Sequence, residues 1–253
     1  MSALVGRHAL VTGASRGIGA ATARKLSAEG AHISLLVRDR VRGEEVARSL
    51  AGAHAIVVAD ITDRSAVQDA CADAAGQLGP IDILVNNAGS TESAPFIRTE
   101  PALFDRMIAE HLLGAVHTTQ AVLPGMIEGR RGHIVNMAST AGLRGEAYVT
   151  AYVAAKHALV GLTRALAVEM EKHGVAVNAV CPGYTDTDLV RESMARVSAK
   201  TGMTEDEALS MILERAGQKR LVSVDDVAKA VVELCVVAPS IEAQAVVVDG
   251  VSE

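Results

Sequence analysis

The sequence reads HALVTGASRGIG from His8 to Gly19, a short apolar run followed at once by a glycine-rich turn. A helical pattern then runs from Ala20 to Glu29. Glycine lets a backbone turn sharply and approach a ligand closely, and a helix N-terminus offers unpaired N–H groups to an anion. The stretch therefore predicts a strand, a phosphate-binding turn and a helix, which together form a dinucleotide cradle. Its spacing, G-x-x-x-G-x-G, differs from the common G-x-G-x-x-G, and the alternative is a turn that binds no ligand.

Further apolar runs alternate with longer amphipathic stretches along the chain: Ile33–Val37, Ala55–Ala59, Ile83–Val85, His133–Met137, Val175–Val180 and Ala245–Val248. This alternation predicts an α/β fold, with a doubly wound, Rossmann-like parallel sheet of about seven strands and helices on both faces. Ligands bind such sheets beyond the carboxyl ends of the strands. Neither a linker nor an internal repeat interrupts the pattern, so we expect a single domain over residues 1–253.

Composition excludes several classes of function. The chain has 253 residues and a net charge of −6, without a Lys/Arg-rich run that would bind nucleic acid or an anionic membrane. Met1 to Gly6 do not form a basic region followed by an apolar stretch, and no apolar run reaches the ~18 residues that span a membrane, so we expect a cytoplasmic protein. Cys71, Cys181 and Cys235 are widely spaced and have no nearby ligand cluster. They predict free thiols and no metal site.

Tyr152 precedes Lys156 by one helical turn, and Ser139 lies upstream of both. The i, i+4 spacing places the phenol and the ammonium on one helix face, where a cation can lower the pKa of a phenol. A tyrosine tuned in this way can transfer a proton near neutral pH. Taken alone, the pair favours an ordinary amphipathic helix that carries a half-exposed tyrosine.

Together these stretches resemble the short-chain dehydrogenase/reductase family, in its shorter branch. The resemblance runs from His8 to about Asp249. It rests on the turn Thr12–Gly19, the motif Asn86-Asn87-Ala88-Gly89, the set Ser139, Tyr152 and Lys156, and Pro182-Gly183 with Thr187. The resemblance implies an oxidoreductase that interconverts a ketone and a secondary alcohol with NAD(P) as cofactor.

The resemblance also implies roles for individual residues. Ser139 and Tyr152 would hold the developing oxyanion, Tyr152 would donate the proton, and Lys156 would bind the nicotinamide ribose. Asp60 resembles the family's residue that bonds the adenine amine. The cofactor-binding residues are expected to be Gly13, Ser15, Arg16, Gly17, Ile18, Gly19, Arg38, Asp60, Ile61, Asn87, Ala88, Gly89, Tyr152, Lys156, Pro182, Gly183, Thr185 and Thr187.

The end of the second predicted strand indicates which dinucleotide binds. Val37 stands where NAD-using relatives have an acidic residue, and Arg38 follows it. An arginine there can bind the 2′-phosphate of NADP, and Arg16 would bring a second positive charge. We therefore predict NADP(H), with NAD(H) as the alternative. In the rival interpretation Arg38 is a surface charge paired with Asp39 or Glu44.

His111 is a departure from the family pattern, which has an asparagine at this place. That asparagine holds a water in a proton relay from the lysine to solvent. Histidine can donate, accept and titrate near neutrality, so His111 is a candidate for the same relay. The alternatives are a different water path, or a histidine that only fills space in a helix.

The substrate pocket is predicted from residues 90–97, Met137, residues 143–148, Tyr184 and a mobile lid over residues 188–220. This set is mostly apolar, with Arg144 and Glu146 at its rim. We predict a ketone with an apolar body, such as a 3-oxoacyl thioester or a related polyketide ketone. An alicyclic, aryl or steroid alcohol dehydrogenase is the alternative.

Further alternatives concern the class of protein and the lid. A dinucleotide-binding redox sensor would have no need of the proton-donating set, and a structural module would leave the glycine turn unexplained. The lid region could instead be a surface helix pair that packs by its methionines and leucines. The resemblance further implies a homotetramer, with interface helices predicted at Pro101–Glu128 and Ala151–His173.

Overall fold

The computed structural model describes residues 3–236, 243 and 245–251 of the chain. Its centre is a seven-stranded sheet with the order β3-β2-β1-β4-β5-β6-β7, and every pair of neighbouring strands is parallel. The strands are β1 (His8–Thr12), β2 (His32–Val37), β3 (His54–Val58), β4 (Ile83–Asn86), β5 (Gly132–Met137), β6 (Val175–Pro182) and β7 (Ala245–Val248). The doubly wound parallel fold predicted from the sequence is confirmed.

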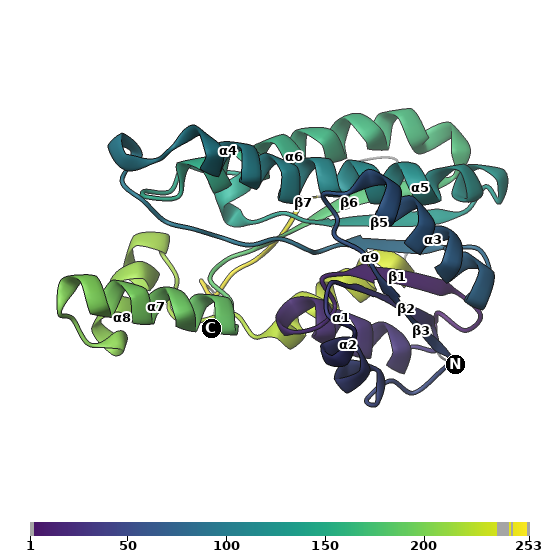
Figure 1. Cartoon of the computed structure of the whole chain (residues 1–253), viewed down its shortest axis with the longest axis horizontal. Coiled ribbons are helices and arrows are strands. Elements are labelled where there is room, and N and C mark those ends of the chain that lie inside the picture. The colour runs from purple at the N-terminus through teal and green to yellow at the C-terminus, as the bar shows by residue number, and fades with distance from the viewer. Residues whose placement is uncertain (1–2, 237–242, 244, 252–253) are drawn as a thin grey trace.

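Two layers of helices cover the sheet (Figure 1). The helices α1 (Gly17–Ala28), α2 (Arg40–Ala47) and α9 (Val224–Val236) pack on one face, and their buried residues form one core cluster. The helices α3 (Arg64–Leu78), α5 (Gly114–Glu128) and α6 (Thr150–Met170) pack on the other face around a second cluster. Central strands such as β1 and β5 are therefore buried throughout, which explains their nearly continuous apolar sequences.

The helix predicted over Pro101–Glu128 is interrupted. It consists of α4 (Pro101–Ile108), a π-helical turn over Ala109–Leu113 and then α5. A π-turn adds one residue to the helical repeat, and it rotates the side chains that follow. His111 lies in this turn and is buried. The sequence pattern did not predict the turn, because both segments keep an ordinary helical periodicity.

The region predicted as a lid forms two helices, α7 (Asp188–Thr201) and α8 (Glu205–Ala216), beside the carboxyl ends of the strands (Figure 1). The Thr187 side chain caps α7, and Thr204 and Glu207 form a reciprocal capping box at the start of α8. Short 3-10 turns occur at Phe96–Arg98, Thr140–Gly142 and Glu171–His173. Within the described ranges, no helix combines the length and the apolar character needed to cross a membrane.

Candidate active site

A cavity of about 690 Å³ lies at the carboxyl end of the sheet. The turns after six consecutive strands, β1 to β6, contribute to its walls, as expected for a doubly wound fold. All the predicted site residues line it except Gly19 and His111. Those that do are Gly13, Ser15, Arg16, Gly17, Ile18, Arg38, Asp60, Ile61, Asn87, Ala88, Gly89, Ser139, Tyr152, Lys156, Pro182, Gly183, Thr185 and Thr187.

The glycine-rich turn has the geometry of a phosphate cradle. Gly13 and Gly17 adopt φ values of 63° and 54°, in the left-handed region that favours glycine. A Cβ on Gly19 would lie 2.4 Å from the Gly13 carbonyl oxygen, so Gly19 lets α1 pack closely against the turn. The residue before α1, Arg16, makes no side-chain cap, which leaves the first N–H groups of the helix for an anion. These residues fit the pyrophosphate of a dinucleotide.

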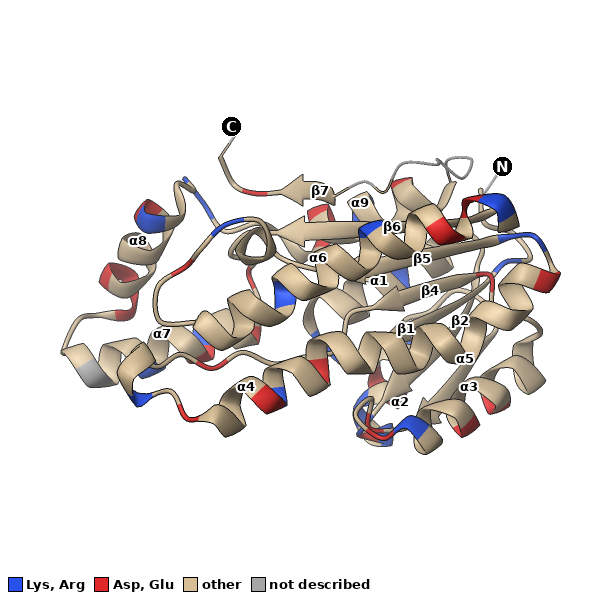
Figure 2. Cartoon of the chain, turned by 90° about the horizontal axis from the view of Figure 1, so that it is seen from above, with Lys and Arg blue, Asp and Glu red and all other residues tan. Residues whose placement is uncertain are grey.

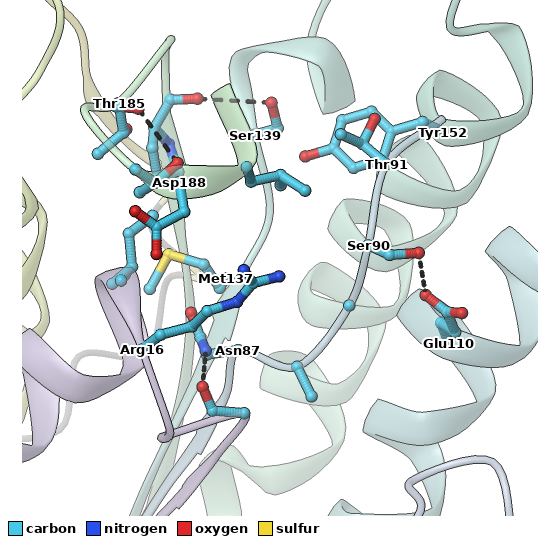
Figure 3. A pocket seen from close by; sticks show the side chains of 18 of the residues that line it. Arg16, Asn87, Ser90, Thr91, Glu110, Met137, Ser139, Tyr152, Thr185 and Asp188 are labelled. Atoms are coloured by element: carbon cyan, nitrogen blue, oxygen red, sulfur yellow. Dashed lines mark hydrogen bonds between the residues drawn. The ribbon is translucent and has the colours of Figure 1, made fainter. Parts of the chain in front are cut away.

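Asn87 holds the glycine turn in place. Its side-chain amide donates to the carbonyl oxygens of Thr12, at 2.9 Å, and Gly13, at 3.2 Å. The Thr12 hydroxyl accepts from the backbone N–H groups of Asn87 and Ala88, at 2.9 and 3.0 Å. The motif after β4 therefore positions the turn after β1, besides lining the cavity (Figure 3).

Positive charge gathers at the end of the cavity that β2 and β3 form. Arg38 lines it, together with Arg42 from the first turn of α2. Asp39 is occupied as the N-cap of α2 and forms an ion pair with Arg42 at 3.6 Å. The ion pair between Arg38 and Asp39 considered above is therefore not formed. Asp60 accepts two hydrogen bonds from Thr62, and these bonds hold the pKa of its carboxyl below the usual value.

Ser139, Tyr152 and Lys156 meet at the other end of the cavity. Ser139 follows β5 and its hydroxyl donates to the Pro182 carbonyl oxygen at 3.4 Å, while Tyr152 and Lys156 lie one turn apart on α6. The Lys156 ammonium lies 5.5 Å from the centre of the Tyr152 ring and donates to the Met137 carbonyl oxygen at 2.6 Å. Figure 3 shows Ser139 and Tyr152 at one side of the cavity and Arg16 and Asn87 at its base.

The acid–base properties of this group differ from the prediction. Burial raises the pKa of Tyr152 to about 12, and the interaction with Ser139 only partly opposes this effect. Burial also lowers the pKa of Lys156 to about 7, so its positive charge is itself disfavoured. The predicted lowering of the phenol pKa by the lysine is therefore not found. Tyr152 is instead a protonated phenol at neutral pH.

His111 lies behind this group, outside the main cavity. Its Nε2 bonds the Ser90 carbonyl oxygen at 2.7 Å, and its ring meets the Tyr152 ring edge-on, with centroids 5.2 Å apart. Its Nδ1 is buried and has no hydrogen-bond partner within the described residues. His111 and Lys156 both line a second cavity of about 10 Å³, roughly the volume that one water needs. The relay role of His111 stays a prediction.

The substrate end of the cavity is more polar than predicted. The apolar side chains of Phe96, Ile97 and Leu143 are exposed and do not line it. Glu146 does line it and accepts a hydrogen bond from the hydroxyl of Tyr184. Other lining residues near this end are Ser90, Thr91, Ser93, Val149, Leu189, Val190 and Ser193.

Arg144, predicted at the rim, bonds the lid instead. Its guanidinium donates to the Ala216 carbonyl oxygen, at the end of α8, with a distance of 2.6 Å. On the opposite side, Arg16 pairs with Glu192 of α7 at 3.3 Å. Sequence reasoning did not identify Arg42, Glu192 or Gln218, which bonds the backbone of Tyr184. Arg42 could have been identified from the sequence, because it lies four residues after Arg38. The positions of Glu192 and Gln218 depend on contacts between segments that are distant in sequence.

Comparisons with known proteins agree with this geometry. The model of the family described as short chain dehydrogenase matches residues 7–198. A ketoacyl reductase named for the granaticin polyketide synthase of Streptomyces violaceoruber is 37% identical over 249 residues, 96% of this chain and 91% of that protein.

Solved structures are also similar over nearly the whole chain. The structure of levodione reductase has a TM-score of 0.91 and 31% identity, covering 98% of this chain and 97% of that one. A variant of the actinorhodin polyketide ketoreductase, solved with NADPH, has a TM-score of 0.89 and 31% identity, covering 96% of each chain. The sequence, the fold and the arrangement of the cavity therefore agree that this chain belongs to the short-chain dehydrogenase family, whose members are oxidoreductases acting on alcohols or ketones with a nicotinamide dinucleotide.

Proposed function

We propose that the protein is an NADP(H)-dependent oxidoreductase that interconverts a ketone and a secondary alcohol, with Tyr152 as the proton donor. The observation that carries the proposal is a single cavity that joins a dinucleotide cradle at Gly13–Gly19 to the group formed by Ser139, Tyr152 and Lys156. A redox sensor would bind the dinucleotide, but it would gain nothing from a half-buried phenol that lines the same cavity as a serine hydroxyl.

The residues of the chain act on the ketone oxygen. Ser139 and Tyr152 donate hydrogen bonds to it, which stabilises the negative charge that develops during reduction. When bound, the nicotinamide supplies a hydride to the carbonyl carbon. Since the pKa of Tyr152 is about 12, its hydroxyl is protonated at neutral pH and can give its proton to the new alkoxide. Lys156, which donates to the Met137 carbonyl, would bind the ribose, and in its protonated form it would stabilise the phenolate left on Tyr152.

The choice of NADP(H) rests on the cations around the adenosine end. Arg38 and Arg42 both line the cavity there, and Asp39 is occupied by the helix cap. A 2′-phosphate would bind these guanidinium groups more tightly than a ribose hydroxyl would. The NADPH bound in the actinorhodin polyketide ketoreductase structure supports the same choice.

A 3-oxoacyl thioester or a related ketone is the proposed substrate class. The similarity to a ketoacyl reductase and to a polyketide ketoreductase supports it. The similarity to levodione reductase supports an alicyclic ketone as the second candidate. Residues 188–220 act as the lid in this proposal, because Leu189, Val190 and Ser193 of α7 line the same cavity.

Oxidation of NADPH in the presence of a ketone panel tests the function. The panel contains 3-oxoacyl thioesters, alicyclic diketones and aryl ketones, and each is assayed with NADPH and with NADH. We expect turnover of at least one class, and a loss of about 10²–10³ in kcat for Tyr152→Phe with unchanged NADPH binding. Tight NADPH binding without turnover of any ketone would favour the sensor instead.

We also propose that the chain is a single domain and that four copies of it form a cytoplasmic homotetramer. The helices α5 and α6 carry few charged residues, as Figure 2 shows, and Val168 of α6 is 74% exposed. Such a face is suited to burial against a second subunit. The three buried thiols suit a reducing compartment. Light scattering that gives a stable monomer would contradict the assembly.

A further inference from the structure

Glu146 places a negative charge inside the substrate end of the cavity. It lies in the turn between the 3-10 helix Thr140–Gly142 and α6, and it lines the same cavity as Ser139 and Tyr152. Its side chain is half-buried. The hydroxyl of Tyr184, which follows Pro182-Gly183, donates a hydrogen bond to Oε1 and fixes the carboxylate in position.

The charge of Glu146 affects the pKa of Tyr152, the proposed proton donor. Its carboxylate contributes to the raised pKa of Tyr152, after burial, and it also raises the pKa of Tyr184 through the hydrogen bond and through its charge. A carboxylate that disfavours a phenolate at Tyr152 disfavours any other anion at the same distance. When the ketone oxygen of a substrate is bound to Ser139 and Tyr152, the carbons next to the ketone are therefore exposed to the negative charge of Glu146.

Nearby cations offset this charge only in part: the charge of Arg144 opposes the rise in the pKa of Tyr184, but within the described residues no cation forms an ion pair with Glu146. Arg144, two residues before Glu146, donates to the Ala216 carbonyl on the lid. Lys156 bonds the Met137 carbonyl, and its pKa is lowered to about 7. Arg106, another cavity-lining cation, pairs with Glu92. Across the part of the chain that the structure describes, the side-chain partner of Glu146 is the neutral phenol of Tyr184.

We propose that Glu146 is a specificity-determining residue that excludes free oxo acids and admits their neutral esters and thioesters. The inference rests on the proposed ketone reduction and deepens it. A carboxylate one or two carbons from the ketone would lie close to that of Glu146, and a like charge at this place weakens binding. An ester or a thioester carries no charge there, so it binds without this repulsion. The substrate class is therefore a neutral 3-oxo ester or thioester rather than the parent acid.

The test compares one ketone in two charge states. We measure kcat/KM for NADPH-dependent reduction of 3-oxobutanoate and of its ethyl ester at neutral pH. The wild-type protein should favour the ester by at least about tenfold. In Glu146→Gln, which keeps an acceptor for Tyr184, the ratio of kcat/KM for the acid to kcat/KM for the ester should rise at least about tenfold.

A matched control removes the same charge far from the cavity. Glu171 is exposed, lies in the 3-10 turn after α6 and does not line the cavity, so Glu171→Gln should leave the ratio of acid to ester unchanged. Reduction of the ester with the same ratio in wild type and Glu146→Gln would overturn this inference alone. NADPH binding without reduction of either compound or of any ketone in the wider panel would overturn the proposed function, and this inference with it.

Discussion

At the scale of single residues, the hydrogen bonds and the ion pair of Asp39 determine whether Arg38 is available to bind a phosphate. Asp39 accepts the N–H groups of Val41 and Arg42 as the cap of α2, and its second oxygen faces Arg42. Arg38 therefore lines the cavity without Asp39 as an ion-pair partner. A guanidinium in this position is available to a phosphate, because a hydrogen bond to a charged group is worth about 1.5–3 kcal/mol.

Replacing Arg38 should reduce the preference for NADPH over NADH. We expect Arg38→Ser to weaken NADPH binding by roughly ten- to a hundredfold and to leave NADH binding nearly unchanged. Fluorescence titration with each dinucleotide measures both. Arg40→Ser is the control, since Arg40 is exposed and bonds the Ile56 carbonyl instead of lining the cavity. Equal NADPH affinity in Arg38→Ser and wild type would contradict the cofactor assignment.

The residue types at positions 89 and 111 depend on each other, because Gly89 packs directly against the His111 ring. A Cβ on Gly89 would lie 2.1 Å from Cε1 and 2.4 Å from Nδ1 of the His111 ring. The ring is buried between this backbone and Tyr152, so it has little room to move. An imidazole at position 111 thus requires glycine at position 89.

This packing predicts an unfolding experiment. Gly89→Ala should lower the free energy of unfolding by about 1–3 kcal/mol, because the added methyl group meets the His111 ring and because alanine is disfavoured at the φ of 159° found here. Adding His111→Asn should recover part of the loss, and a double-mutant cycle in urea measures the coupling. In the control Gly76→Ala, on α3, the methyl group meets nothing within 4 Å and should be neutral or slightly stabilising. Additive effects of the two changes would show that the ring is not the obstacle.

At the scale of elements, Arg144 connects two segments that are distant in sequence. Its guanidinium bonds the last carbonyl of α8 from the turn before α6. We expect Arg144→Ala to speed hydrogen exchange in residues 205–216 by about tenfold or more, since a charge-assisted hydrogen bond to the helix end is lost. Mass spectrometry of peptides from α8 measures this, and Arg215→Ala supplies the same charge change on α8 itself. Unchanged exchange in Arg144→Ala would mean that α8 is held by its other contacts.

The strands were predictable because burial on both faces leaves a continuous apolar run. The predicted bounds of β1 and β7 agree with the structure, and those of β2 to β6 differ by one or two residues at their ends. The π-turn at His111 was not predictable, because one extra residue in a helix leaves no periodic signal. Glu146 was expected at the rim and lies in the cavity, since its position depends on the hydrogen bond from Tyr184.

At the scale of the whole molecule, buried histidines make stability depend on pH. His8 and His133 lie at the amino ends of β1 and β5, around the buried carboxylate of Asp82, and His111 lies behind the active site. Burial lowers the pKa of all three below the ordinary value of 6.5, that of His111 furthest. Charging them in the folded protein would place cations in the interior without enough compensation.

The sign of the effect follows from proton binding. Well above pH 6.5 these histidines are neutral in both states, so their contribution to stability is complete. As the pH falls below 6.5, the unfolded chain binds protons that the folded chain does not, and the free energy of unfolding decreases. The slope reaches at most about 1.4 kcal/mol per pH unit for each histidine that stays neutral in the folded state.

Urea unfolding at a series of pH values between 7 and 5 measures this slope. Substitution of single histidines shows how much each of them contributes to it. His111→Asn removes one proton-binding difference, so the slope should fall by up to about 1.4 kcal/mol per pH unit even if the variant is less stable at every pH. His54→Gln, at an exposed histidine, should leave the slope unchanged. A free energy of unfolding that stays constant from pH 6.5 downwards would show that the buried histidines acquire protons without cost. In that case His111 would be free to titrate beside Lys156, and a proton path through it would gain support.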